Sequence, residues 1–371
     1  MKAMTLVGRK VPLELQRRDD LTPAEGQVVI KLKAAALNRR DYWITVGLYP
    51  GIKPPVVLGS DGAGIVSACG AGVDPGWEGQ EVILNPGIGW GGNPTVQSEG
   101  FHILGLPADG TFASEVVVPA EQLHRKPAGL TWEESAALPL AGVTAYRALF
   151  TQGNAAAGER ILITGIGGGV ATFALQFAVA LGAEVWVTSS SPSKIERAMS
   201  LGAKGGFDYR EDGWQKKHAS QAGAPDLIID GAGGPAYCSL LELVAPGGRI
   251  INYGATAGAP EKIDMFKVFW KQLQLRGSTM GSPDDFSDML RFVEKHHLFE
   301  ILVSPYLYKV SNLFLFFVLR QLYLIAKYLY QEATYNLRIV ASLVDCRISF
   351  APPLPSCTKI IAQLIILKKS F

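Results

Sequence analysis

Cysteine is scarce in this chain, and neither sign of charge dominates. Only four cysteines occur among 371 residues, and no two form a Cys-x-x-Cys pair. A disulfide framework and a cysteine-rich zinc site are therefore not expected. The 35 lysines and arginines are balanced by 33 acidic residues, for a net charge of +2. Because no basic patch is interleaved with aromatic residues, nucleic acid is not an expected partner.

The first residues, MKAMTLVGRKVPLEL, lack an apolar run followed by a small-residue cleavage site. No secretion signal is predicted, and a cytoplasmic location is the expectation. Internal repeats and low-complexity linkers are missing as well. With 48% hydrophobic residues, a chain of this length can form two domains that each have a core.

Glycine is absent after Gly281, although the chain contains 41 glycines. Residues 301–371 hold eight of the 35 basic residues but only two acids, Glu332 and Asp345, which leaves 27 basic and 31 acidic residues before them. This shift in composition predicts an atypical hydrophobic basic tail that was not selected together with the rest of the chain.

Within the tail, residues 310–330 form a stretch long enough to span a membrane. Arg320 and Lys327 interrupt it, and each costs about 2.5–3.5 kcal/mol near a bilayer centre. A soluble amphipathic helix and a surface-bound helix are equal alternatives. Membrane association of the tail is therefore left open but is not favoured.

Two patterns of secondary structure are predicted for the rest of the chain. Short strand-like runs broken by glycine and proline dominate the first part, and Thr131 with Glu134 then forms a capping box that begins a helix. From Arg160, strands and helices alternate over about 120 residues, which predicts a parallel, doubly wound sheet. We expect an α/β protein with a β-rich domain over 1–125, a doubly wound domain over 126–282, a return toward the first domain over 283–300, and the tail over 301–371.

The segment ILITGIGGGVATFALQFA, residues 161–178, is the candidate dinucleotide-binding motif. A strand runs directly into glycines and then into a helix, whose N-terminal N–H groups can bind a pyrophosphate that glycine lets approach closely. A tight turn without a ligand is the alternative, which the following strands disfavour. The residues predicted to bind cofactor here are Gly165, Gly168, Gly169, Val170 and Ala171.

The second strand of this domain ends in hydroxyl residues instead of an acid. An NAD site usually places Asp or Glu about 20 residues after the glycines, where it binds the ribose. Here residues 188–191 read Thr-Ser-Ser-Ser, and Lys194 follows. Hydroxyl groups and an ammonium can bind a 2′-phosphate, so Ser189, Ser190 and Lys194 predict NADPH. The serines are also suited to turn the chain before Pro192, and both roles are compatible.

The stretch VVLGSDGAGIV, residues 56–66, holds three glycines and an aspartate between apolar runs. A phosphate cradle, a metal site and a bent strand are the alternatives. No helix begins after the glycines, so no helix dipole is available for a phosphate, and the cradle is excluded. Glycines are disfavoured in regular strands, and a bend or bulge explains them.

With the segments 36–50, 138–149, 165–185 and 243–255, these features resemble the medium-chain dehydrogenases and reductases over about residues 1–300. The resemblance implies a GroES-like N-terminal domain followed by a Rossmann domain. In zinc-dependent members the GSDGAG place reads Gly-His-Glu-x-x-Gly, whereas Ser60 and Asp61 stand here. The family's first cysteine ligand falls on Asn38, and the lobe with four zinc-binding cysteines falls on residues 85–105, which contain none.

Zinc prefers three or four imidazole, thiolate or carboxylate ligands, so no metal site is expected. The chain is similar to the zinc-free quinone-oxidoreductase branch, some members of which are labelled zinc-type alcohol dehydrogenase-like. This implies NADPH-dependent reduction of quinones or α,β-unsaturated carbonyls, in which the developing enolate oxygen needs hydrogen-bond donors. The catalytic candidates are Tyr42, Asn38 and Arg40. The alternatives are that Tyr42 packs the domain and that Arg40 faces water.

The resemblance also implies further cofactor contacts. Thr144 is expected near the nicotinamide and Tyr209 near the adenosine, while Gly231, Tyr253 and Gly281 mark carboxyl ends of later strands.

A small-molecule substrate is the expected partner, and a homodimer is left open. The alternatives to an active reductase are an NADPH-binding protein with little turnover and a defective variant. In the latter, the tail would fail to supply the closing strand and helix of the substrate domain.

Overall fold

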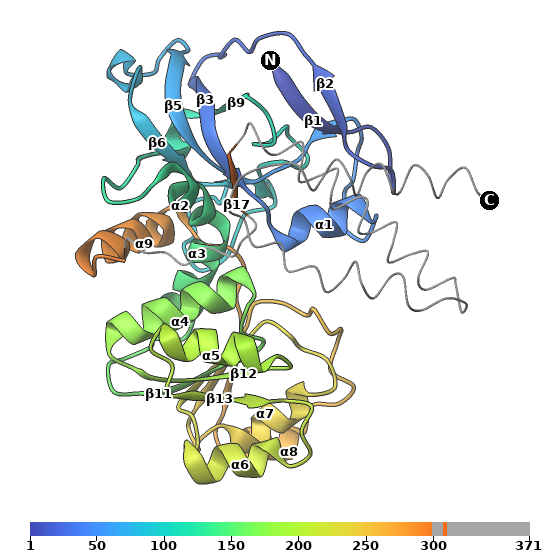
Figure 1. Cartoon of the computed structure of the whole chain (residues 1–371), viewed down its shortest axis with the longest axis vertical. Helices are drawn as coiled ribbons and strands as arrows, with labels where there is room; N and C mark the ends of the chain where they lie inside the picture. Colours follow the sequence, from blue (N-terminus) through green and yellow to red (C-terminus); the bar gives the residue numbers. More distant parts are fainter. Residues whose placement is uncertain (299–306, 310–371) are drawn as a thin grey trace, which may run out of the picture. The chain divides into compact units, whose positions relative to one another are not determined.

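The computed structural model describes residues 1–298 and 307–309, and most of the predicted tail, including residues 310–330, lies outside them. Figure 1 shows the β-rich domain in blue to teal and the helices and strands of the second domain in green to gold. Within the described residues, no helix is long and apolar enough to cross a membrane.

The β-rich domain is built on a six-stranded sheet in the order β10-β6-β5-β3-β17, with β9 also paired to β3. Its strands are β3 (Gln27–Ala36), β5 (Asp61–Cys69), β6 (Glu81–Leu84), β9 (Glu115–Pro119), β10 (Leu123–Arg125) and β17 (Leu307–Lys309). A second sheet has the order β2-β1-β4, and β7 pairs with β8. These strands are β1 (Lys2–Leu6), β2 (Glu14–Arg17), β4 (Val56–Val57), β7 (Gly87–Ile88) and β8 (His102–Ile103).

The glycines of the GSDGAG stretch lie where β5 bends against β3. The register between the two strands shifts between Leu32 and Ala34, as the sequence predicted. A Cβ atom on Gly64 would lie 2.2 Å from the carbonyl oxygen of Lys31. Because no side chain fits at that distance, glycine is required at this position by the close approach of the two backbones.

The strand β17 corrects one expectation about the tail. Leu307, Tyr308 and Lys309 pair antiparallel with Ala36, Ala35 and Ala34 of β3. The expectation that residues after about 300 leave the substrate domain without a closing strand is therefore wrong for these three residues. A strand this short carries too little alternation for a sequence pattern to indicate it, and its partner is distant along the chain.

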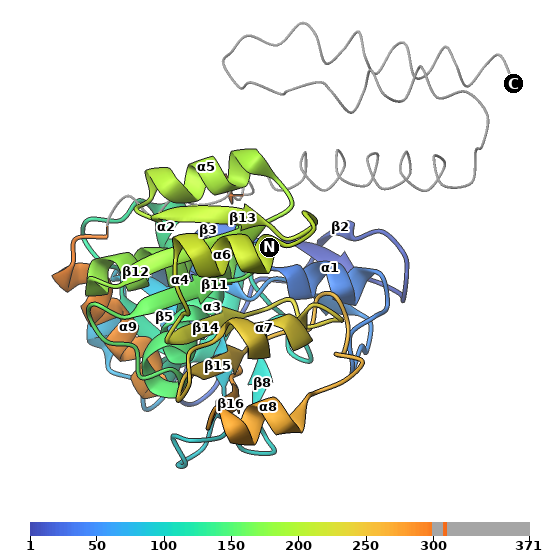
Figure 2. The same ribbon diagram turned by 90° about the horizontal axis from the view of Figure 1, so that it is seen from below.

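The second domain is a parallel sheet in the order β13-β12-β11-β14-β15-β16, the doubly wound arrangement that the sequence predicted (Figure 2). Its strands are β11 (Arg160–Ile163), β12 (Glu184–Ser189), β13 (Gly205–Asp208), β14 (Leu227–Asp230), β15 (Arg249–Asn252) and β16 (Gln274–Gly277). Alternate strand residues face opposite sides: Ile161 and Ile163 join one buried cluster, whereas Leu162 joins another.

Helices cover both faces of this sheet, with α4 (Gly169–Leu181) and α5 (Pro192–Ser200) on one side in Figure 1. The other side carries α6 (Trp214–Gln221), α7 (Tyr237–Leu243) and α8 (Met265–Trp270). The remaining helices are α1 (Arg39–Thr45), α2 (Trp132–Ala137), α3 (Pro139–Tyr146), the π-helical turn η3 (Arg147–Gln152) and α9 (Pro283–Lys295). The described residues also contain two short 3-10 turns, η1 (Pro75–Trp77) and η2 (Ala120–Gln122).

The helix α2 begins with the predicted capping box. The Glu134 N–H donates to the Thr131 hydroxyl at 3.2 Å, and the Thr131 N–H donates to the Glu134 carboxylate at 2.8 Å. Although α2 lies after the predicted boundary at residue 125, it packs on β3 and β5 of the β-rich domain. The helix α9, in the predicted return segment, packs against α3.

We expect His218 to make the protein less stable in acid. The side chain is buried beside Phe207 and Trp186, and neither ring nitrogen has a hydrogen-bond partner. Burial lowers its pKa from 6.5 to about 4, so the unfolded state binds a proton that the folded state does not. The stability that this group contributes is present above pH 6.5 and is lost as pH falls toward 4. Urea unfolding between these pH values should show a decrease in the free energy of unfolding, and this decrease should be smaller in His218→Leu.

Candidate functional site

The loop between β11 and α4 has the backbone geometry of a phosphate site. Gly165 has a φ of +64°, and Gly168 is the N-cap of α4, which no side chain caps. The first-turn N–H groups, on Gly169, Val170 and Ala171, are those that a helix leaves without intrahelical acceptors. Ala171 is buried in the core, as expected for the position where the helix packs closely on the strand. All five motif residues predicted to bind cofactor therefore lie on one loop and helix start.

Lys194 of α5 reaches this loop. A Cβ atom on Gly167, whose φ is +104°, would lie 2.7 Å from the Lys194 Cδ atom. The aliphatic part of the lysine therefore rests on the glycine loop. Ser189, at the end of β12, is buried and accepts a hydrogen bond from the Ser191 N–H at 3.2 Å, while Ser190 is half-buried. The serines thus turn the chain, and their binding to a phosphate stays a prediction.

Sequence reasoning missed Asp230, which organises the carboxyl ends of the central strands. Its carboxylate accepts hydrogen bonds from the Thr164 hydroxyl at 2.6 Å, the Asn252 amide at 2.9 Å and the Gly233 N–H at 2.9 Å. These donors follow or end β11, β14 and β15. Between β11 and β14 the strand order reverses, and doubly wound sheets bind ligands at this point. In the sequence, the aspartate that ends the apolar run LIID was the signal that could have identified Asp230.

Gly231 and Tyr253, both predicted from their strand ends, lie in direct contact. A Cβ atom on Gly231 would lie 2.4 Å from the Tyr253 hydroxyl oxygen. Burial, and secondly the charge of Asp230, raises the pKa of the Tyr253 phenol, so the phenol stays protonated. Tyr209, which follows β13, is 46% exposed. Gly281 follows β16 and approaches α3 closely, since a Cβ atom there would lie 2.5 Å from Val143 Cγ2.

Thr144 of α3 lies beside Met280, which the sequence did not single out. The Thr144 hydroxyl donates to the Leu140 carbonyl at 2.7 Å and lies 3.9 Å from the Met280 sulfur. Met280 is buried and has a φ of +46°, a conformation that is costly for a side chain of its size. Such strain gathers at functional sites, and Met280 follows β16 and lies beside Thr144, which is predicted to lie near the nicotinamide. A positive φ at a non-glycine residue leaves no mark in the sequence.

Asn38 and Asp61 form the centre of the candidate substrate site. Asn38 precedes α1, and its side-chain Nδ2 donates to Asp61 Oδ2 at 2.8 Å. The other carboxylate oxygen of Asp61 accepts the N–H of Leu140, at the start of α3, at 2.9 Å. Asp61 is only 1% exposed, and this burial raises its pKa to about 8 in spite of the two hydrogen bonds.

Arg40 is buried, so the alternative in which it faces water is wrong. Its guanidinium donates to the Ser60 hydroxyl at 2.6 Å and to the Leu104 carbonyl at 2.9 Å, and it lies 5.1 Å from the centre of the Tyr49 ring. These contacts place it beneath the GSDGAG segment. Tyr42 is half-buried on α1, with its ring centre 5.2 Å from that of Trp43. A role of Arg40 or Tyr42 in catalysis stays a prediction.

The residues at the place of the family's catalytic zinc do not suit that metal. They offer the amide of Asn38, the hydroxyl of Ser60 and the carboxyl of Asp61, and both Asp61 oxygens already accept N–H donors. Ser60 accepts a hydrogen bond from Arg40, and a cation beside a guanidinium is unfavourable. Across residues 1–298 and 307–309 no cluster of three or more His, Cys, Asp and Glu side chains forms a metal site.

The purified protein is therefore expected to carry zinc at well below one equivalent. The physical reason is that an amide and a hydroxyl bind zinc weakly and a single carboxylate cannot replace three ligands. Elemental analysis after dialysis measures the content, and treatment with a chelator should leave turnover unchanged. Stoichiometric zinc, or loss of turnover with the chelator and recovery with zinc, would contradict this.

The doubly wound sheet, its glycine loop and the adjoining GroES-like domain define a two-domain, nicotinamide-dependent oxidoreductase. Residues 24–128 match the alcohol dehydrogenase GroES-like domain family, and residues 169–295 match the zinc-binding dehydrogenase family.

Comparison with known proteins identifies relatives of the chain along most of its length. A zinc-type alcohol dehydrogenase-like protein of Leptosphaeria maculans is 37% identical over 77% of this chain and 84% of its own length. An acryloyl-coenzyme A reductase of Sulfurisphaera tokodaii is 29% identical over 80% of this chain and 89% of its own. The crystal structure of an NAD-dependent alcohol dehydrogenase has a TM-score of 0.75 at 35% identity, covering 80% of this chain and 89% of that one. The chain belongs to the medium-chain dehydrogenase/reductase superfamily.

Proposed function

We propose that this oxidoreductase uses NADPH to reduce quinones or α,β-unsaturated carbonyl compounds without zinc. The observation that carries the proposal is the donor set at the family's metal position. It contains an amide, Asn38, whose hydrogen bond to Asp61 leaves a second N–H for a substrate oxygen. Bound NADPH supplies a hydride to the β-carbon of an activated double bond. Neutral donors suffice for the oxygen of such a substrate, whereas simple alcohol oxidation lacks its usual Lewis acid.

Within this proposal, the roles of the chain's own residues differ. Asn38 donates an N–H to the developing enolate oxygen, and Tyr42 supplies a hydroxyl from the next turn of α1. Arg40, held by Ser60 and Leu104, contributes positive charge from beneath the site. A relative named as an acryloyl-coenzyme A reductase supports an activated alkene as the substrate class, because an acryloyl thioester carries its double bond next to a carbonyl.

The choice of NADPH over NADH rests on the second strand of the nucleotide-binding domain. No carboxylate ends β12, and Lys194 lies over the glycine loop. The related crystal structure is described as NAD-dependent, so NADH is the competing cofactor that a titration must exclude. The substrate is a small molecule, the expected location is the cytoplasm, and a homodimer is the expected assembly if the protein self-associates.

A substrate panel tests the function. Purified full-length protein is mixed with NADPH and, in turn, benzoquinone, hexenal, cyclohexenone and a simple aliphatic alcohol with NADP⁺. Loss of NADPH absorbance with the quinone or the enals, and little reaction with the alcohol, is the expected outcome. Tight NADPH binding with no turnover of any compound would overturn the proposal and would favour a cofactor-binding protein.

Replacing Tyr42 by phenylalanine is expected to lower kcat about tenfold while leaving the Kd for NADPH within twofold. The change removes one hydroxyl donor from the substrate oxygen but keeps the ring and its contact with Trp43. Steady-state kinetics and a fluorescence titration with NADPH separate the two effects. Unchanged kcat would show that Tyr42 only packs the domain.

A further inference from the structure

The Asp61 carboxylate is a buried group that connects the two domains. It lies at the start of β5, where Asn38 donates to Oδ2 from the β-rich domain. The donor to Oδ1 is the N–H of Leu140, in the helix α3 that also carries Thr144. The Asp61 carbonyl accepts a third hydrogen bond, from the Thr111 hydroxyl at 2.8 Å. One residue therefore fixes Asn38 relative to the helix beside the predicted nicotinamide position.

The hydrogen-bonding chemistry of a carboxylate selects one of the two orientations of the Asn38 amide. An amide side chain can turn over and exchange its oxygen for its NH₂ group at nearly equal cost in packing. When it is ionised, above its pKa of about 8, the carboxylate only accepts hydrogen bonds, so it then holds the NH₂ edge of Asn38 toward itself and rejects the oxygen edge. An asparagine at position 61 could itself donate to Asn38 and would leave the orientation of the amide to its capping-box contact with the Asp41 N–H.

We propose that Asp61 is a positioning residue that holds the Asn38 amide in the one orientation that offers an N–H to substrate, and that ties this amide to α3. The kinetic part of this inference rests on the proposed reductase function. The hydrogen-bonding part does not, because the Asn38–Asp61–Leu140 contacts exist in the protein alone.

Two charged groups of α1 act on Asp61. Asp41 disfavours its ionisation and Arg40 favours it, while α3 contributes the uncharged Leu140 N–H; burial is the largest influence. The buried carboxyl group is therefore protonated in the folded protein over a range in which it is ionised in the unfolded chain. Burial raises the pKa of Asp61 from its ordinary value of 3.8 to about 8 in the folded protein. The folded state retains a proton between these values, so the stability from this group falls as pH rises from about 4 to 8.

The test is a double-variant cycle on full-length protein, with Asp61→Asn, Asn38→Ala and the combination, assayed with NADPH and benzoquinone. At about pH 9, where Asp61 is ionised, Asp61→Asn should lower kcat at least tenfold with the Kd for NADPH within twofold. In the Asn38→Ala background the same change should alter kcat by less than twofold. The wild-type kcat should rise through about pH 8, and Asp61→Asn should remove that rise. Effects of the two variants that simply multiply would overturn the proposal, as would an unchanged kcat.

Asp74→Asn is the matched control, because it makes the same substitution at an exposed site of the same domain, where Asp74 accepts the Gly76 N–H. It should change neither kcat nor its pH profile. If the wild-type protein reduces neither benzoquinone nor hexenal, the proposed function fails, and unfolding decides the inference about Asp61. The unfolding constants of the Asp61→Asn and Asn38→Ala variants should then be coupled at least fivefold. The slope of stability between pH 4 and 8 should also change in Asp61→Asn. The proposal would be overturned if the two substitutions changed the unfolding constant independently and Asp61→Asn left the dependence of stability on pH unchanged.

Discussion

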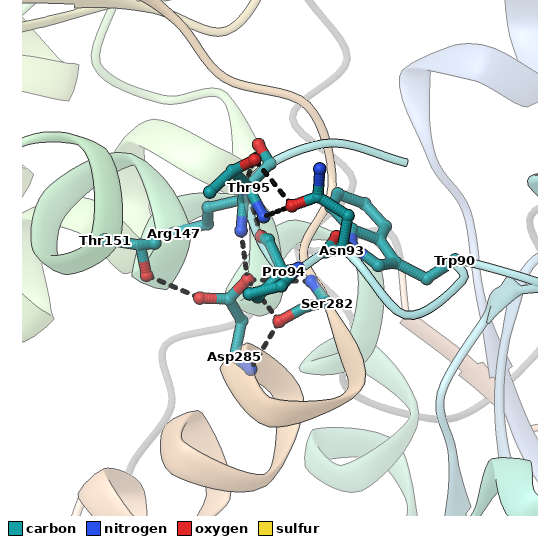
Figure 3. Close-up of polar contacts among 8 residues, drawn as sticks. All are labelled: Trp90, Asn93, Pro94, Thr95, Arg147, Thr151, Ser282 and Asp285. Atoms are coloured by element: carbon teal, nitrogen blue, oxygen red, sulfur yellow. Dashed lines mark hydrogen bonds and ion pairs between the residues drawn. The ribbon is translucent and has the colours of Figure 1, made fainter. Parts of the chain in front are cut away.

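Asp285→Ala is expected to destabilise the protein by about 3–5 kcal/mol, because it removes one partner of a buried ion pair. The Arg147 guanidinium donates to Asp285 Oδ2 at 2.5 Å, and the two side chains are 2% and 6% exposed (Figure 3). The carboxylate also accepts the Thr151 hydroxyl at 2.5 Å and the Ser282 hydroxyl at 2.9 Å. Without it, Arg147 would remain buried as an uncompensated charge.

The loss would affect contacts between the two domains as well. Arg147 also donates to the carbonyls of Pro94 and Thr95 and lies 4.9 Å from the centre of the Trp90 ring. It therefore holds a loop of the β-rich domain against η3 and α9, as Figure 3 shows. Urea unfolding monitored by tryptophan fluorescence measures the change in the free energy of unfolding. An unchanged slope of this free energy against urea concentration would show that the surface exposed on unfolding stays the same.

Glu211→Ala is the matched control for this prediction. Glu211 pairs with Lys217 at 2.8 Å, but both side chains are more than half exposed. A surface pair of this kind contributes about 0.2–1 kcal/mol. If Asp285→Ala cost no more than Glu211→Ala, the buried pair would not stabilise the fold. Adding Arg147→Met to Asp285→Ala should recover part of the loss, since it removes the buried charge that the single change leaves unpaired.

The sequence predicted the nucleotide-binding domain well because its signals are local. Each of the six strands, each helix between them and the strand–glycine–helix transition at Gly165 is contained in fewer than about 20 residues. The bend at GSDGAG was predicted for the same reason: glycines without a following helix exclude a phosphate cradle within one short stretch. Gly64 then proved to lie against the Lys31 backbone, which is the close approach that such glycines indicate.

The candidate substrate site is formed by contacts that no local sequence pattern indicates. Arg40 lies next to polar residues in the sequence, yet it is buried against Ser60 and the Leu104 carbonyl. The bond from Leu140 to Asp61 joins residues separated by 79 positions. Such pairings follow from how two domains pack, and only the resemblance to a family indicated where Asn38 and Asp61 would lie.

Buried charges show the same limit. Asp230 and Asp285 each satisfy several donors from distant segments, and the sequence shows each of them only as an acid beside a strand end or a helix start. In the case of Asp285, the local capping box with Ser282 was a readable signal, but the ion pair with Arg147 was not. What sequence reasoning lacked was the set of partners, which determines whether an acid stabilises a fold, positions a ligand or is merely solvated.

Lys194→Ala is expected to weaken NADPH binding about 10- to 100-fold, because one charge-assisted contact with a phosphate contributes roughly 1.5–3 kcal/mol. NADH lacks the 2′-phosphate, and its Kd should change by less than about threefold. Lys194 belongs to α5, which follows the end of β12, where the ribose is expected, and its stem lies on Gly167 of the glycine loop. Titration of both cofactors into wild type and variant measures the ratio of their affinities.

Two control variants separate charge from packing at this position. Lys194→Arg keeps a cation with a long stem and should retain most of the preference for NADPH. Lys216→Ala, on the exposed side of α6, removes an equal charge away from the glycine loop and should leave both affinities unchanged. Equal weakening of NADH and NADPH by Lys194→Ala would assign the lysine to the packing of the loop. A wild-type preference for NADH would contradict the cofactor assignment itself, since serines and a lysine at the end of β12 would then be insufficient to select the 2′-phosphate.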